Sequence, residues 1–116
     1  MTVGDHNIAI GTLAGCSQSS NFFNVGVGSY ALKSATAGCN TAIGYRAGEF
    51  ITTGVRNVIV GQCAMRLTTT GSSNTAVGDC ALQSNTGGSG NVAIGSCALY
   101  SSTTANSITA VGCCAL

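Results

Sequence analysis

The stretch that decides the fold is "NTAVGDCALQSNTGGSG", residues 74–90, which is followed at once by "NVAIGSCALYSSTTANS", residues 91–107. Asn, Gly, Cys, Ala and Leu occupy the same places in both stretches, so the chain repeats itself with a period of 17 residues. Self-similarity at a fixed period is the signature of a repeat architecture, in which each copy packs mainly against its neighbours. The repeat therefore predicts the fold before any single residue is interpreted.

The pattern Asn-x-Ala-Ile/Val-Gly-x-x-Ala extends over seven copies, which begin near residues 7, 24, 40, 57, 74, 91 and 108. Its Gly recurs at steps of 17, 16, 17, 17, 17 and 17 residues, from Gly11 to Gly112. We number the positions of each copy as slots, counted from the repeat Asn as slot 1. By length and by this repeat, we expect residues 1–116 to form a single repeat domain.

A copy of this length is too short for a pair of helices and suits one coil of a β-solenoid. The stretch before the slot-5 Gly alternates as a short strand, "x-Cys-Ala-Leu" after it predicts a second strand, and the Ser/Thr/Gly/Asn remainder predicts a loop. We expect the Ile/Val of slot 4 to form a continuous dry core, with coils stacked about 4.8 Å apart in a rod of roughly 33 Å. The sequence thus predicts an all-β, parallel β-solenoid (β-roll) of about seven coils.

A Gly or Asn recurs late in the predicted loop, where a residue with positive φ is expected. These residues are Asn21, Gly38, Gly54, Gly71 and Gly88.

The copies "NTAIGYRAG", "NTAVGDCAL" and "NVAIGSCAL" resemble the tandem-repeat shafts of phage and viral tail fibres. They are also similar to the "SVAIG"-type repeats in the heads of trimeric autotransporter adhesins. The resemblance runs from about residue 7 to the end of the chain. It implies a left-handed β-roll and a trimeric cross-section, with three chains packed around one axis.

The composition argues against several classes of function. Charged residues make up 6% of the chain and the net charge is +1, so nothing indicates binding to nucleic acid or to an anionic membrane. No apolar run is long enough to span a bilayer, and no secretory signal precedes the repeats. The acids Asp5, Glu49 and Asp79 fall in three different slots, and the one histidine, His6, lies near the terminus. We therefore expect no enzyme and no cofactor.

The repeat Asn is expected to form a structural ladder, because stacked side-chain amides can hydrogen-bond along a cross-β stack. Its members are Asn7, Asn24, Asn40, Asn57, Asn74 and Asn91. The slot-10 residues Lys33, Glu49 and Arg66 are expected to form a surface ladder of alternating charge.

The cysteines of slot 7 form a second row, in which neighbouring Cα atoms about 4.8 Å apart lie within the range for disulfides. Two interpretations stay open: the thiols fill space as small apolar groups, or they form disulfides within the row or between chains. Seven cysteines cannot all pair in a monomer, so Cys113 beside Cys114 is a candidate for an intersubunit bond. A linear stack does not offer the convergence that a tetrahedral metal site needs. The candidate disulfide residues are Cys16, Cys39, Cys63, Cys80, Cys97, Cys113 and Cys114.

Neither end of this sequence carries a recognisable capping repeat. Two interpretations stay open: one chain stops nearly where the next chain would begin, or the chain is a segment of a longer fibre whose neighbouring repeats supply the caps. The sequence therefore predicts a structural protein that polymerises head to tail into an extracellular filament or a viral fibre shaft, on whose loops Ser and Thr offer sites for O-linked sugar. The alternative is an adhesin or receptor-binding module that recognises glycans, although Phe22, Phe23, Tyr45, Phe50 and Tyr100 are scattered in sequence. Ice binding is a weaker alternative, because Thr41, Thr75 and Thr109 occupy slot 2 only in alternate copies.

Overall fold

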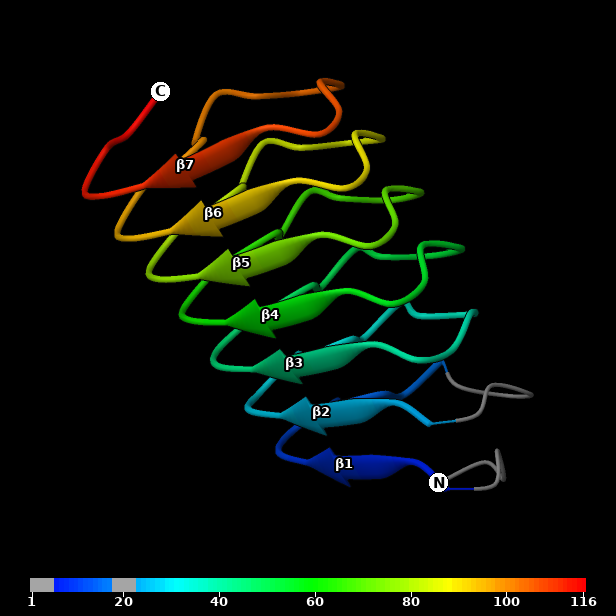
Figure 1. The fold of residues 1–116 in the computed structure, drawn as a ribbon. Helices are drawn as coiled ribbons and strands as arrows, with labels where there is room; N and C mark the ends of the chain where they lie inside the picture. Colours follow the sequence, from blue (N-terminus) through cyan, green and yellow to red (C-terminus); the bar gives the residue numbers. More distant parts are fainter. Residues whose placement is uncertain (1–5, 18–22) are drawn as a thin grey trace.

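Each copy of the repeat contributes one three-residue strand to a single parallel sheet. The structure is a computed structural model that describes residues 6–17 and 23–116. The strands are β1 (Ile8–Ile10), β2 (Val25–Val27), β3 (Thr41–Ile43), β4 (Val58–Val60), β5 (Thr75–Val77), β6 (Val92–Ile94) and β7 (Thr109–Val111). They follow one another in the sheet in chain order, as Figure 1 shows. The predicted parallel β-solenoid is confirmed.

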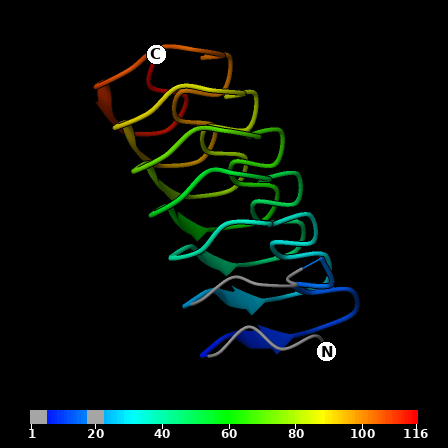
Figure 2. The same ribbon diagram turned by 90° about the vertical axis from the view of Figure 1, so that its right-hand side faces the viewer.

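The register between neighbouring strands places equivalent slots of the repeat opposite each other at all six interfaces. Slot 2 of β5 pairs with slot 2 of β6, Thr75 with Val92, and the same holds from β1 to β7. The strands face the viewer in Figure 1 and run from right to left while the chain rises, which is the left-handed winding that was expected. The rod measures 39 × 21 × 17 Å, and Figure 2 shows the coils stacked along its long axis.

The core is lined by slot 3 and not by slot 4, so the prediction that the Ile/Val row is buried was wrong. Ala42, Ile59 and Ala76 of slot 3 have no exposed surface, whereas Ile43 and Ile94 of slot 4 are 43% and 40% exposed. Alternate residues of a strand point to opposite faces, and in every coil slot 3 points inward, with Ala in most coils and the larger Ile59 in coil 4. The rest of the core comes from slots 8, 9 and 12.

The chain turns a corner directly after the slot-5 Gly, so the predicted second strand is absent from the described coils. In coil 5, residues 74–90, Gly78 has a φ of 135°, and Cys80 and Leu82 at slots 7 and 9 have φ values of 56° and 52°. These left-handed residues bend the chain back toward the core, which an extended strand could not do. Leu82 thereby becomes fully buried, and the same turn recurs in the other coils.

The Gly of slot 15 is required by close packing and not, as predicted, by a positive φ. A Cβ built on Gly71 would lie 2.5 Å from the carbonyl oxygen of Gly88 in the next coil, closer than real Cβ contacts. Positive φ values occur instead just before the repeat Asn, at Gly90 (70°) and Ser107 (58°). In coil 2 slot 15 is Ala37, and Gly38 follows it; Asn21 lies outside the described residues.

Candidate functional site

The Asn side chains of slot 1 lie in one row inside the sheet edge and bind mainly to the main chain. In each coil the side-chain oxygen accepts the main-chain N–H of slot 1 in the next coil, as from Asn74 to Asn57 at 2.9 Å. The side-chain amide donates to the slot-15 carbonyl, as from Asn57 to Gly71 at 2.9 Å. Direct amide-to-amide bonds join Asn57 to Asn40 and Asn74 to Asn57. The slot-1 residues Asn24, Asn40, Asn57, Asn74 and Asn91 are buried. Their hydrogen bonds hold the loop of each coil against its strand and link consecutive coils.

A threonine ladder in slot 13, which was not predicted, links the opposite side of the coil. Each hydroxyl donates to the main-chain carbonyl of the next threonine, at 3.0 to 3.2 Å. The ladder comprises Thr36, Thr52, Thr69, Thr86 and Thr103. A count of threonines at this slot could have revealed it, because five consecutive copies agree. The hydroxyl hydrogens of Thr36, Thr52, Thr69 and Thr86 are thus used within the protein.

All seven cysteines lie within the described residues, and all are free thiols, without a disulfide in the row. Cys63, Cys80 and Cys97 are half-buried at slot 7, and the sulfur atoms of the exposed Cys113 and Cys114 lie 3.6 Å apart. Burial and the hydrogen bond to Asp79 raise the pKa of the Cys80 thiol to about 11. A hydrogen bond with Cys113 likewise raises the pKa of Cys114. Both thiols are therefore held in the weakly nucleophilic, protonated form.

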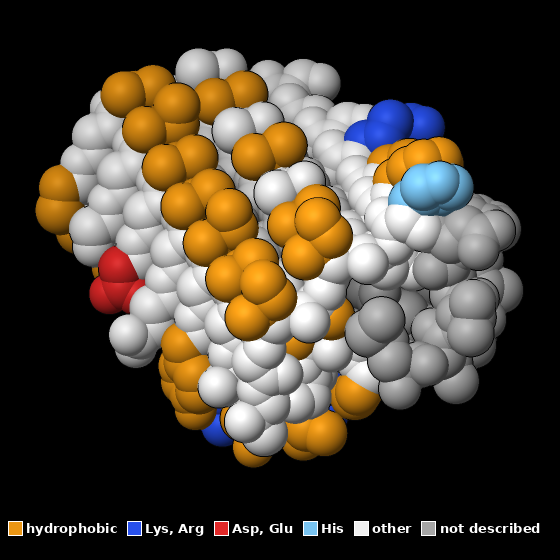
Figure 3. Space-filling view, turned by 90° about the horizontal axis from the view of Figure 1, so that it is seen from below, with side chains coloured by type: hydrophobic (Ala, Val, Ile, Leu, Met, Phe, Trp, Pro, Cys, Tyr) orange, Lys and Arg blue, Asp and Glu red, His pale blue; other side chains and the backbone are white. Residues whose placement is uncertain are grey.

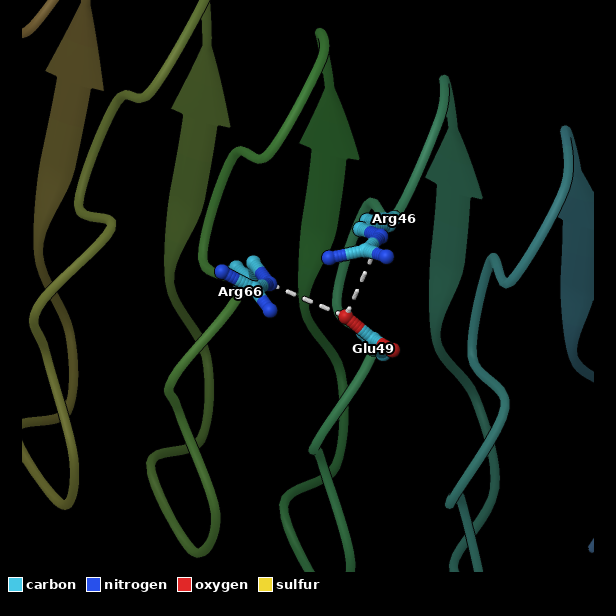
Figure 4. Close-up of polar contacts among 3 residues, drawn as sticks. All are labelled: Arg46, Glu49 and Arg66. Carbon is cyan, nitrogen blue, oxygen red and sulfur yellow. Dashed lines mark hydrogen bonds and ion pairs between the residues drawn. The ribbon is translucent and has the colours of Figure 1, made fainter.

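Four of the chain's charged side chains, Lys33, Arg46, Glu49 and Arg66, lie on the corner of coils 2 to 4. Glu49 is almost completely buried and accepts a hydrogen bond from Arg66 Nε at 2.9 Å, while Arg46 Nε lies 3.9 Å from the same oxygen. Figure 4 shows the carboxylate between the two guanidinium groups. The hydrogen bond to Glu49 raises the pKa of Arg66, so this arginine stays charged. Two members of the predicted slot-10 ladder thus form an ion pair, whereas the ammonium of Lys33 lies over the ring of Tyr30.

Aromatic rings surround this charged cluster, although the sequence suggested that they were scattered. The rings of Tyr30 and Tyr45 meet edge to face at 6.2 Å, and the Arg46 guanidinium lies over both, at 5.4 and 5.1 Å from their centroids. Arg66 lies over Phe50 at 5.6 Å. Tyr30 and Arg46 share slot 7 in consecutive coils, and that shared slot was the signal that could have brought them together. We call Tyr30, Lys33, Tyr45, Arg46, Glu49, Phe50 and Arg66 the aromatic–cation patch.

The outer face of the sheet carries two parallel rows of side chains, from slots 2 and 4. Figure 3 shows one unbroken row of apolar side chains beside a second row that polar side chains interrupt. Slot 4 holds only Ile and Val, while Thr and Val alternate along most of slot 2. Val58 and Val111 are 44% and 66% exposed, so this flat face has no covering element in the described chain.

Among residues 6–17 and 23–116, no group of three or more His, Cys, Asp or Glu is close enough to hold a metal ion. His6 stacks on Phe23 with ring centroids 5.2 Å apart, and Asp5 lies outside the described residues. No helix in the described part of the chain could cross a membrane.

Comparison of the chain with protein-family models, with curated proteins and with solved structures gave no match. The function is therefore inferred from the geometry of the coils and their surfaces.

Proposed function

We propose that this protein is a structural β-solenoid whose copies stack end to end into a fibre, as an extracellular filament or a virion fibre shaft. The observation that supports this function is the equivalence of the six interfaces between neighbouring coils. At each of them the same slots face each other and the same main-chain and Asn hydrogen bonds cross. A stack with equivalent interfaces contains no element that sets its length.

The two outer edges of the sheet are complementary in their hydrogen-bonding groups. The slot-2 N–H donates to the slot-1 carbonyl of the following coil, as from Val92 to Ile108 at 2.8 Å. The slot-5 N–H donates to the slot-4 carbonyl of the preceding coil, as from Gly112 to Ile94 at 2.8 Å. The equivalent donors at the outer edges are Thr109 on β7 and Gly11, directly after β1, so β1 of a second copy can pair with β7 in the same register.

The exposed sheet face supports lateral association of such stacks. It is flat, free of charged side chains and rich in β-branched residues that repeat at every coil. One coil presents too little of this face for a stable interface, but the area of the face grows with every chain that is added to a fibre. We propose that this face packs against the same face of other chains, within the trimeric cross-section that the sequence resemblance implies.

Electron microscopy and sedimentation velocity of the purified chain over a range of concentrations test the end-to-end contact. We expect fibres, and we expect Thr109→Pro to abolish them, because proline removes the edge donor. Thr109→Val keeps the N–H and serves as the matched control. Short particles at every concentration, or fibres that Thr109→Pro leaves unchanged, would contradict the proposal.

Ile108 offers a second test in the opposite direction. It is the one slot-1 residue that is not Asn, so its side chain cannot supply the acceptor that Asn57 provides for the Asn74 main-chain N–H at 2.9 Å. Ile108→Asn supplies that acceptor and is expected to lower the concentration at which fibres appear, by about fivefold for one added hydrogen bond. An unchanged or higher concentration would place the joint between copies elsewhere.

A further inference from the structure

The aromatic–cation patch is the most strongly charged part of a nearly neutral molecule. The chain has four Lys and Arg and three Asp and Glu, and three of the four cations lie in the patch around one carboxylate. The patch thus carries a local charge of two, from three cations minus Glu49, although the whole chain carries +1. This concentration of positive charge is not needed for coil stacking, because coils 5 and 6 form the same backbone with Gln83 and Tyr100 at slot 10.

Arg46 is held in place, yet its donors are unused. The rings of Tyr30 and Tyr45 fix the guanidinium plane from two sides, and the distance of 3.9 Å to Glu49 is too long for a hydrogen bond. Its buried Nε has no hydrogen-bond partner among the described residues, in contrast to Arg66 at 2.9 Å. The Arg46 side chain is 33% exposed, so the outer N–H groups of its fixed guanidinium can meet the two oxygens of a carboxylate or a sulfate.

Two rings of the aromatic–cation patch remain accessible. Tyr45, beside Arg46, is 44% exposed, and Phe50, beside Arg66, is 37% exposed. An aromatic face and an exposed ring edge suit the apolar C–H face of a sugar ring, while the tyrosine hydroxyls can bind its hydroxyl groups. The chain's net charge of +1 gives little long-range attraction, so the ligand has to be recognised by short-range contacts, unlike nucleic acid on a basic surface.

We propose that Tyr30, Tyr45 and Arg46 form a binding site for an acidic carbohydrate. The guanidinium of Arg46 binds the carboxylate or sulfate group, and the exposed tyrosine and phenylalanine rings contact the sugar. Arg66 and Glu49 position the site, because their ion pair fixes the loop that follows Arg46. This site would equip a fibre with a surface for polysaccharide, and it does not depend on how the fibre assembles.

Isothermal titration of the full chain with dextran, dextran sulfate and polygalacturonate tests this site. We expect binding to one or both acidic polymers and none to dextran, and the two acidic polymers distinguish sulfate from carboxylate. Arg46→Gln is expected to weaken binding about tenfold or more, the size of effect typical of a central arginine at an interface. Tyr45→Ala is expected to weaken it about fivefold by removing the ring.

Arg56→Gln is the matched control for Arg46→Gln. Arg56 is exposed, lies at slot 17 outside the patch, and has nearly the same φ as Arg46, 57° against 58°. Both variants lower the net charge by one, and a circular dichroism melt shows that each is folded. Equal losses in the two variants, no binding to either acidic polymer, or equal binding to single-stranded DNA would each overturn the assignment. Loss of binding in Arg46→Gln while fibres still form would separate this site from the assembly contact.

Discussion

Coils 3 and 5 have the same backbone but fill the core with different side chains at slots 9 and 12. Coil 3 has Gly48 at slot 9 and Ile51 at slot 12, whereas coil 5 has Leu82 and Asn85 at these slots. A Cβ on Gly48 would lie 3.0 Å from the end of the Ile51 side chain, so the missing side chain makes room for the larger neighbour. The core therefore accepts different residues at slots 9 and 12, provided that the neighbouring side chains leave each other room.

The corner of the coil after slot 5 differs even more between the N-terminal half of the molecule, to which coil 3 belongs, and the C-terminal half, to which coil 5 belongs. Coils 2 to 4 present the aromatic–cation patch there, and coils 4 to 7 present the row of thiols from Cys63 to Cys114. Slot 7 points to the solvent side in both halves, so its residue is free to vary while the Gly, Ala and Asn slots are not. The comparison shows that the repeat fixes a scaffold and leaves the corner for local chemistry.

Alanine at the slot-5 Gly tests whether both halves share one scaffold, and it should give the largest effect. A Cβ would lie 2.6 Å from the Gly61 oxygen at Gly44 and 2.5 Å from the Gly112 oxygen at Gly95, with φ values of 135° and 130°. We expect Gly44→Ala and Gly95→Ala to lower the free energy of unfolding by similar amounts, about 3 kcal/mol or more, measured by urea denaturation. The control is Gly87→Ala, where the nearest atom is a threonine hydroxyl at 3.3 Å. Markedly different losses in the two halves would show that the backbone is not equivalent.

Replacing Arg66 with the residue that coil 5 has at slot 10 tests the charged corner. Arg66→Gln removes the hydrogen bond to Glu49 and leaves a nearly buried carboxylate with Arg46 at 3.9 Å as its remaining cation. Because Arg66 is partly exposed and water screens the pair, we expect a loss of about 1–2 kcal/mol in the free energy of unfolding. The double variant Glu49→Gln/Arg66→Gln should recover part of this loss. A single variant as stable as the wild type would show that the ion pair contributes nothing.

The thiol row should give the smallest effect, and only at high pH. The pKa of Cys80 is raised from 9.0 to about 11. Between pH 9 and pH 11 the Cys80 side chain is therefore a thiolate in the unfolded chain but a protonated thiol in the folded chain. The folded state then binds more protons than the unfolded state, and stability falls as the pH rises from about 9 to about 11. Denaturation midpoints at pH 8 and pH 10.5 should therefore differ more in the wild type than in Cys80→Ser. Equal shifts in the two proteins would rule out Cys80 as the titrating group.

Much of the fold followed from the repeat, but the inner and outer faces of the strand did not. Seven copies in phase indicated the parallel stack, the coil boundaries and the Asn row. The Ile and Val of slot 4 looked like a core because they are the larger apolar residues, yet the sheet hides Ala42 and Ala76 instead. The alternation of a strand can be read from the sequence, but the direction in which the coil closes decides which of the two faces lies inside, since even the larger Ile59 is buried between Val58 and Val60.

The candidate sites were predictable only in part, for a related reason. The spacing predicted the row of cysteines. Tyr45 and Arg46 lie about one period after Tyr30, and the spacing did not indicate that these three residues form a group. Their contact needs the stacking of consecutive coils and the left-handed turn at slot 7.

The sequence by itself determined the architecture, because a 17-residue period with a fixed Gly and Asn permits one kind of stack. The tertiary structure alone decided which side chains are buried, which hydrogen bonds the Asn and Thr rows make, and where the charges meet. These outcomes depend on distances between coils of about 4.8 Å, which bring residues 17 positions apart in the chain into direct contact.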